Sequence, residues 1–483
     1  MSSYRVGADP PAPGPPSGMT GLLAPGGRAA QPSTQQAGSG PRWRRPAAAR
    51  GRYFPHMAVH NIWMVILLIV IIGKVGEWAP VISGLPVLKI TFVLAAIYVN
   101  RVSVLYTPVR VLSLPLARLA IAFLTLSIVS IIFSVYKSNT LISSYLSVIY
   151  LISFVMLVKT TQTRRDVERL LIGLAVAGVS LSIFELLDFH GGRAKLSGTN
   201  PNDLAYALVT LLPIVLTLRA RASGWRHLIV VGLAVVMCTA VLLTASRGGA
   251  LGLVIVLLAV SVFPLVPAKN GELKRRSLAA VLVAVGIIAG LGVVLFSYLP
   301  ADTQERLLTL IHPEQDYNAS TTLNSSRRVI WMRDLGLALE RPIGYGMASS
   351  MAVDGYYGHG QFRAVHNSVI QAFLELGALG LYLYLATYYV AWRELGRIAA
   401  ARPRDGPAGE GTKVVLYARA LRVALLGNFV AGFFLTQAYA ASLWMLIAIC
   451  CAFIRIVAAD TNLEIRQPDA ATHGWRRRRR VGS

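Results

Sequence analysis

The chain has 483 residues, of which 55% are hydrophobic and only 14% are charged, and its formal net charge is +25. This composition is typical of an integral membrane protein and argues against a water-soluble globular enzyme. The positive charge does not indicate nucleic-acid binding, because the basic residues lie at the ends of apolar segments and in two arginine-rich tails. Three cysteines lie within apolar runs, with the spacing of neither metal ligands nor a disulfide framework.

The two ends of the chain are predicted to be cytoplasmic tails. Residues 1–57 are rich in proline, glycine, serine and alanine, a composition that favours disorder. Residues 459–483 contain the basic run WRRRRR. Such tails can bind anionic lipid or nucleic acid, but we interpret them as determinants of orientation beside the membrane and expect no nucleic-acid partner.

Apolar runs fill the chain between the tails, and a membrane span needs about 20 such residues. We predict twelve transmembrane helices, nine within residues 58–299 and three within residues 366–458. The predicted fold is therefore an all-α polytopic membrane protein. The predicted spans are 58–74, 85–100, 112–134, 140–158, 168–187, 203–219, 228–244, 247–267, 278–299, 366–392, 421–437 and 441–458.

Lysine and arginine are unevenly distributed between the loops that join these spans. The loops KTTQTRRDVER, RARASGWR and AKNGELKRR and the segment 393–422 are basic, whereas YKSN, FHGGRAKLSGTNPN and TQAYA carry few or no basic residues. Because basic loops stay in the cytoplasm, both termini are predicted to be cytoplasmic. Residues 300–365 then form a large extracytoplasmic loop, in which SSRRVIWMRDLGLALERP predicts a helix that is stopped by Pro342 and a GYG turn.

Two arginine motifs are predicted at the outer surface. TASRGGALG (244–252) opens an inward-running helix with Ser246 as its N-cap, which places Arg247 at the membrane edge, and the glycines permit close helix contact. Arg327 and Arg328 begin the helix in the loop. Each motif has a simpler explanation: Arg247 as an interfacial anchor, and the arginine pair as a solvated helix face.

A histidine and a group of short polar residues are predicted at the same surface. His366 opens the helix that follows the loop, where a single histidine is often only a cap. GTNPNDLAYALVTLLP places Asn202 and Asp203 at the mouth of another inward-running helix. Because guanidinium groups and helix N-termini both favour phosphate, the combination predicts an anionic ligand, plausibly a lipid-linked diphosphate.

A stripe of polar residues runs along the helix that His366 opens. Asn367, Gln371 and Glu375 recur at intervals of four and share one face. Polar groups are costly in hydrocarbon, so we expect this face to pack against neighbouring helices through buried hydrogen bonds. Asn367, which lies at the helix mouth, is also a candidate for binding substrate.

The motifs SRGG, SSRRVIW, RPIGYGM and HNSVIQAFLELGALGL, in this order, resemble those of the bacterial O-antigen ligase and polymerase superfamily. The resemblance covers residues 60–458 and is strongest from 244 to 380. It implies a GT-C-like enzyme of the bacterial inner membrane that transfers a glycan from undecaprenyl diphosphate to an acceptor hydroxyl. It implies no cofactor and no metal, and we interpret Glu314 and Asp316 as residues of a solvated loop.

The resemblance also assigns roles to individual residues. Arg247, Arg327 and His366 correspond to the family's functional arginines and histidine, and Arg327 is identified by its position four residues before Trp331. Arg328 leaves that register open by one residue. Arg328, Asn367, Asn202 and Asp203 are the predicted substrate-binding residues.

Chemistry supports these roles, because arginines stabilise the charge that develops on a departing diphosphate and a neutral histidine accepts the hydroxyl proton. A single displacement of this kind inverts the anomeric centre.

Two further questions stay open at this stage. A polymerase would join two lipid-carried glycans, whereas a ligase would move one to another acceptor, and we favour the polymerase because no other acceptor is implied. A chain-length regulator and a flippase are conceivable partners. The alternative outside enzymology is a transporter or flippase of a lipid-linked glycan or another anion, which would show inverted halves, broken central helices or mid-membrane charges.

Overall fold

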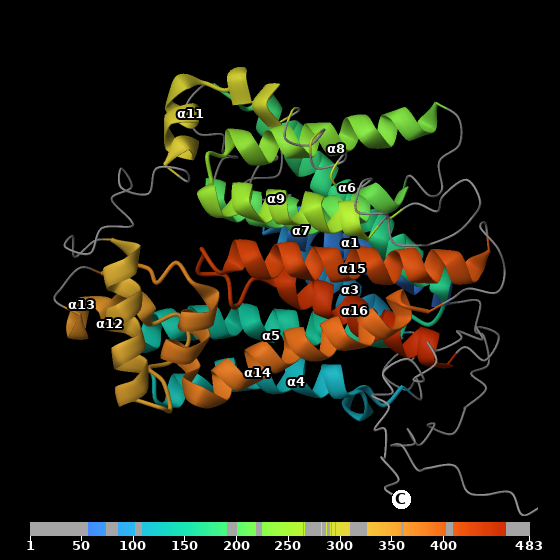
Figure 1. Ribbon diagram of the computed structural model, residues 1–483. Coiled ribbons are helices and arrows are strands. Elements are labelled where there is room, and N and C mark those ends of the chain that lie inside the picture. Colours follow the sequence, from blue (N-terminus) through green and yellow to red (C-terminus); the bar gives the residue numbers. More distant parts are fainter. Residues whose placement is uncertain are drawn as a thin grey trace, which may run out of the picture. The chain divides into compact units, whose positions relative to one another are not determined.

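The chain is all-helical in the computed structural model, which contains no strand among the residues that it describes (Figure 1). The described residues are 57–73, 86–101, 109–190, 200–218, 225–263, 265, 282, 286, 290, 292–294, 296–309, 326–358, 362–401 and 409–459. Both predicted tails lie outside these ranges apart from residues 57 and 459. Within the described ranges, seven helices are long and apolar enough to cross a membrane, which confirms the polytopic membrane fold.

The seven long apolar helices are α4 (Pro115–Val129, continued by the 3-10 turn η3, Ser130–Ile132), α5 (Lys137–Thr160), α6 (Arg164–Leu187), α8 (Arg226–Leu243), α14 (Ser368–Ala399), α15 (Glu410–Gly432) and α16 (Ala441–Ala459). Shorter apolar helices are α1 (Met57–Gly73), α3 (Val87–Arg101), α7 (Pro201–Thr217) and α9 (Arg247–Val262). Together these helices overlap eleven of the predicted spans. The remaining span, 278–299, lies mostly outside the described residues. The other elements are η2 (Val111–Ser113), α11 (Ala301–Leu308), α12 (Arg327–Glu340) and α13 (Ser350–Tyr357).

The predicted basic loop 393–422 is wrong in extent, because most of it is helical. Helix α14 continues to Ala399 and α15 already begins at Glu410. Arg393 and Arg397 both pair with Glu394, at 2.9 and 3.0 Å, and such pairs stabilise a helix that has left the apolar phase. Charge therefore marks the end of the membrane span, while the helix itself continues.

Helix α15 packs against α7, α9 and α14 near the centre of the bundle (Figure 1). Small residues allow these close approaches, as predicted for the glycines after Arg247. A Cβ added at Gly249 would lie 2.5 Å from the Cβ of Ala205, and one at Gly252 would lie 3.1 Å from Val209. Buried polar groups also join α15 to α7: the side chain of Asn428 accepts from Tyr206 and donates to Thr210.

Helix α14 is broken at Gly377, where φ is 67° and ψ is −165°. The sequence predicts one continuous span there, and this expectation is wrong. The break leaves backbone groups without helical partners, which is costly in an apolar phase unless other groups bond to them. The turn after α12 supplies those groups: Tyr345 N–H donates to Leu374 O at 3.0 Å, and Ala378 N–H donates to Pro342 O at 2.8 Å.

The same turn is held from its other side by α4 and α5. Met347 N–H donates to the hydroxyl of Ser130 at 2.9 Å, and the hydroxyl of Thr140 donates to Met347 O at 2.7 Å. Val135 N–H donates to Tyr345 O at 3.0 Å. The GYG turn was predicted only to stop α12. In the structure, residues 342–348 are inserted between α5 and the break in α14, so the segment after α12 and the bundle share one hydrogen-bonded core.

We predict that Gly377→Ala destabilises the protein by about 3 kcal/mol or more, because its backbone conformation is accessible almost only to glycine. An added Cβ would also overlap Pro342 O. The measurement is thermal unfolding of the purified protein in detergent. The matched control is Gly232→Ala in α8, where an added Cβ meets no atom within 4 Å. Equal melting temperatures for the two variants would contradict the proposed role of the break.

Candidate functional site

The turn that joins α15 to α16, residues 433–440, contacts every element on which a functional residue was predicted. It bonds to α12 through Phe434 O, to the backbone of His366 through Thr436, and to α7 through Gln437. The sequence TQAYA within it had been read only as a loop that lacks basic residues. No charge or recognised motif marks this turn, which is why sequence reasoning missed its role.

His366 lies immediately before α14 and is half-buried. Its backbone φ is 50°, a conformation that is uncommon for residues other than glycine, and its N–H donates to the hydroxyl of Thr436 at 2.9 Å. Burial, followed by the nearby charges of Arg327 and Arg363, lowers the pKa of His366 from 6.5 to about 4. The imidazole is therefore uncharged at neutral pH and is electrostatically coupled to two arginines.

Arg327 is the first residue of α12, and Ser326 caps that helix by accepting from Val329 N–H. The Arg327 guanidinium is half-buried and donates to Phe434 O at 3.3 Å. Arg328 is exposed. Of the two candidate arginines, Arg327 is therefore the one that faces the 433–440 turn. Its charge is also one of the two that lower the pKa of His366.

Trp331 ties α12 to the segment that carries the histidine. Its indole N–H donates to Val365 O at 2.7 Å, one residue before His366. Its ring also packs edge-on against Phe433, with 5.6 Å between the centroids. In the sequence, Trp331 was used only as the reference position that distinguishes Arg327 from Arg328. Its contacts give it a structural role in holding Arg327 and His366 at a fixed separation.

Arg247 is the first residue of α9, and Ser246 caps this helix by accepting from Gly249 N–H at 3.2 Å, as predicted. The Arg247 guanidinium is half-buried and donates to the hydroxyl of Thr309, after α11, at 3.0 Å. A Cβ at Gly248 would lie 2.7 Å from Phe434. Phe434 therefore contacts the start of α9 with its side chain and Arg327 with its carbonyl.

The polar residues at the start of α7 also reach the 433–440 turn. Asn200 is the N-cap, accepting from Asn202 N–H at 2.9 Å. The carboxylate of Asp203 accepts from the Gln437 side chain at 2.6 Å. Asn202 and Asp203 therefore lie at the same end of the bundle as His366, with Asp203 bonded to the turn that holds it.

Asn367 does not present a free side chain to a substrate. It is buried, and its side-chain oxygen caps α14 by accepting from Val369 N–H and Ile370 N–H. Its side-chain oxygen is therefore used in capping, and a role of Asn367 in substrate binding stays a prediction.

The rest of the polar stripe faces neighbouring elements, as predicted. Gln371 accepts from Ala438 N–H at 3.0 Å, and the buried Glu375 accepts from Ala348 N–H at 2.8 Å and from Ser350 N–H at 3.1 Å. The stripe thus ties α14 to the 433–440 turn on one side and to the start of α13 on the other.

Positive φ angles at residues other than glycine gather around these groups. In the described part of the chain the four such residues are Ala245, Ala348, Phe362 and His366. Ala245 lies two residues before Arg247, and Ala348 donates to Glu375. Each such residue costs free energy that the surrounding contacts must offset, and strain of this kind clusters at functional sites.

Two buried acids escaped the sequence analysis, which had singled out Glu375 as the deep carboxyl. Glu185 in α6 and Asp334 in α12 are both fully buried, with no hydrogen-bond partner among the described residues. Asp334 lies outside the membrane spans, and burial raises its pKa from 3.8 to about 7, with Arg333 opposing the shift and Glu375 adding to it. Both acids occupy helix positions that look ordinary in sequence, so only packing identifies them.

The described residues contain no group of three or more histidine, cysteine, aspartate or glutamate side chains placed to hold a metal ion. Glu314 and Asp316 lie outside those residues. The independence from metal therefore stays a prediction.

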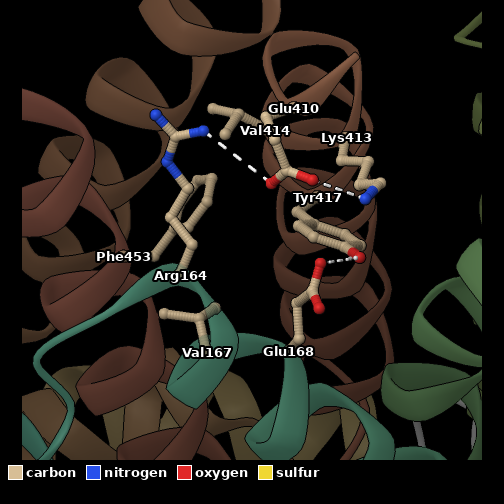
Figure 2. A pocket seen from close by; sticks show the side chains of 8 residues that line it. All are labelled: Arg164, Val167, Glu168, Glu410, Lys413, Val414, Tyr417 and Phe453. Atoms are coloured by element: carbon tan, nitrogen blue, oxygen red, sulfur yellow. Dashed lines mark hydrogen bonds and ion pairs between the residues drawn. The ribbon is translucent and has the colours of Figure 1, made fainter. Parts of the chain in front are cut away.

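A small pocket lies at the other end of the bundle, between the first turns of α6 and α15 (Figure 2). In Figure 2, Glu410 lies between Arg164, at 3.9 Å, and Lys413, at 2.6 Å, and the Tyr417 hydroxyl donates to Glu168 at 3.0 Å. Helix α15 extends from this pocket to the 433–440 turn, a separation of roughly 33 Å at 1.5 Å per residue. The pocket therefore belongs to the contact between α6 and α15, and is remote from His366.

A family model described as O-antigen ligase matches residues 232–385, a segment that contains Arg247, Arg327 and His366. No curated protein matches the chain. The match supports a glycosyltransferase-like role in polysaccharide biosynthesis in a bacterial membrane. It also implies a lipid-linked glycan donor and an acceptor.

We predict that Thr436→Val lowers the transfer rate by about tenfold without unfolding the protein, because a buried N–H next to the His366 ring loses its acceptor. Thr436→Ser, which keeps the hydroxyl, is the matched control and should retain nearly full activity. The measurement is kcat and KM for glycan transfer in detergent, together with the melting temperature. Full activity of Thr436→Val with loss in Thr436→Ser would show that the methyl group, and not the hydrogen bond, is important.

Proposed function

We propose that this chain, which residues 232–385 place in the O-antigen ligase and polymerase superfamily, transfers a glycan from undecaprenyl diphosphate to an acceptor hydroxyl at the outer face of the inner membrane. The observation that carries the proposal is the meeting of Arg327 and His366 at the 433–440 turn. This arrangement places a group that can bind phosphate beside a group that can accept a proton.

The donor diphosphate binds between Arg247 and Arg327. Both arginines are the first residue of a helix that a serine caps, so that each combines a guanidinium with the positive end of a helix dipole. Negative charge builds on the diphosphate as its bond to the sugar breaks. Fixed positive groups stabilise that charge, and the loss of one such contact typically costs about 3 kcal/mol.

His366 is the proton acceptor. The acceptor oxygen attacks the anomeric carbon, the bond from that carbon to the diphosphate oxygen breaks, and the hydroxyl proton passes to the neutral imidazole. The diphosphate leaves with the electron pair, and the configuration at the anomeric carbon is inverted. No metal enters this step, because the two arginines carry the charge stabilisation.

Donor binding also prepares the base in this proposal. The positive charge of Arg327 contributes to the low pKa of His366 in the empty protein. A bound diphosphate offsets that charge and raises the histidine pKa, which makes the imidazole a stronger base. His366 thus becomes most basic when a donor is present, which disfavours reaction in its absence.

A polymerase remains the favoured branch, in which the acceptor is a second lipid-linked glycan.

One feature of the structure is also typical of transporters, because the long apolar helix α14 is broken. Transporters use such breaks to line a cavity with free backbone groups. Here Leu374 O and Ala378 N–H are already bonded to residues 342–346, which favours a structural role for the break.

The proposal is tested by three alanine substitutions in the purified protein. Arg327→Ala and His366→Ala should each reduce transfer by at least about a hundredfold. Arg328→Ala, at the exposed neighbouring position, is the matched control and should stay within about threefold of the wild type. Arg327→Lys should recover activity only in part, because an ammonium lacks the bidentate fork.

Two results would contradict the proposal. Full activity of both Arg327→Ala and His366→Ala would remove the assigned site. Loss of activity in excess EDTA, with recovery on addition of a divalent ion, would require a metal.

The pH dependence should show the low pKa of His366. We expect kcat/KM, which reports the free enzyme, to stay level as the pH falls through 6.5 and to decline only near about 4. The acidic limb of kcat should lie at higher pH, because bound diphosphate offsets Arg327. Arg363→Gln should move the decline in kcat/KM to higher pH, since one lowering charge is removed.

The lowered pKa of His366 also makes the free energy of unfolding depend on pH. The unfolded chain binds the histidine proton more tightly than the folded protein, so this group destabilises the fold as the pH falls from 6.5 towards 4.

In the kinetic measurement, a kcat/KM midpoint near 6.5 in the unmodified protein would contradict the assignment of His366 as the buried base.

A further inference from the structure

We infer that Tyr356 and Phe362 form a stacking site for sugar rings of the acceptor glycan. The inference rests on the proposed function, since it is the acceptor whose hydroxyl must reach His366. Phe362 lies four residues before His366, so that their Cα atoms are at most roughly 14 Å apart. The donor diphosphate is bound at the arginines, which leaves the Phe362 side of His366 for the acceptor.

The two rings form a rigid aromatic surface open to solvent. Tyr356, at the end of α13, is 68% exposed and Phe362 is 50% exposed. Their centroids are 5.6 Å apart and their planes are inclined at 77°, the edge-to-face arrangement that aromatic pairs prefer. Because the two rings already pack against each other, a ligand can stack on their faces without first having to order these side chains. Pyranose rings suit such a surface, because they stack their C–H faces on aromatic rings while their hydroxyls stay in water.

Buried groups hold Phe362 outward in an unfavourable backbone conformation. Its φ is 48°, which is a genuine outlier for a bulky side chain. The buried carboxylate of Asp354 accepts from the next residue, Arg363 N–H, at 2.8 Å, and pairs with Arg333 on α12. Gly355 leaves room for the ring, since a Cβ there would overlap Phe362. Local strain that is offset by so many contacts indicates that the position of this ring has a use.

The main competing use for exposed aromatic rings is anchoring in the membrane interface. In Figure 1, α12 crosses the end of the long helices, and α13, which contacts both α12 and α14, lies at that same end. Arg363, next to Phe362, is exposed as well. These positions favour an aqueous ligand over the bilayer.

Direct glycan binding to the full-length protein in lipid nanodiscs tests the site. The probe is the oligosaccharide released by mild acid from the producing cells' own lipid-linked glycans, and its binding is followed by saturation-transfer NMR. Tyr356→Leu and Phe362→Leu keep an apolar side chain but remove the ring, and should each weaken binding by about tenfold. Tyr356→Trp should bind as well as the wild type. Met351→Ala, at an exposed apolar position on the same helix, is the matched control and should have no effect.

The outcomes separate this inference from the proposed function. If the wild type transfers glycan but both leucine variants keep its affinity and its KM for acceptor, the stacking site is wrong and the transferase stands. If glycan binds and the leucine variants weaken it while no transfer occurs with any lipid-linked donor, the site stands and the transferase is wrong. Quenching of a fluorophore at Tyr356→Cys by lipids brominated near the headgroup, with glycan binding unchanged in the leucine variants, would assign the pair to the membrane interface and overturn the inference.

Discussion

The hydrogen bonds of the 433–440 turn are the constraint on which the His366 end of the bundle depends. The turn follows α15, and it bonds to α7, to α12, to His366 before α14 and to Gln371 in the first turn of α14. Its own backbone groups carry several of these bonds, among them Phe434 O and Ala438 N–H. A shift of this turn would therefore move an arginine and a histidine together, which keeps their separation constant while the rest of the outer segment adjusts.

Buried carboxylates provide a second level of organisation around that turn. Glu375 accepts from two backbone N–H groups at the start of α13, so that an acid inside a long apolar helix fixes a helix of the segment 326–358. Asp354 does the same for the chain after α13, through Arg363 N–H and the Arg333 side chain. Burial of charge is costly unless each group has partners, and these acids meet that requirement through backbone donors. The result is an outer segment whose shape is set by the bundle.

The sequence predicts those features that depend on local patterns. Ser246 caps α9 and the polar stripe of α14 faces inward, because capping and helical periodicity involve residues only a few positions apart. The break at Gly377 could not be predicted, since LELGALGL is as apolar as an unbroken span. Asn367 was a candidate for substrate binding because it lies at the helix mouth, and the structure adds that its side-chain oxygen caps α14. The 433–440 turn contains no charged residue, so its importance comes entirely from long-range contacts.

The break at Gly377 has a consequence for the order in which the chain is assembled. Pro342 and Ala378, which bond across the break, are separated by 36 residues, whereas Val135 and Tyr345 are separated by 210. Residues 342–346 are synthesised before α14, so the groups that complete this helix are already present when it enters the bilayer. Closing the shorter loop costs about 1.5 kcal/mol less in entropy than closing the longer loop to Val135. Insertion of α14 can thus proceed on local partners, and docking against α4 and α5 can follow as a later step of biogenesis.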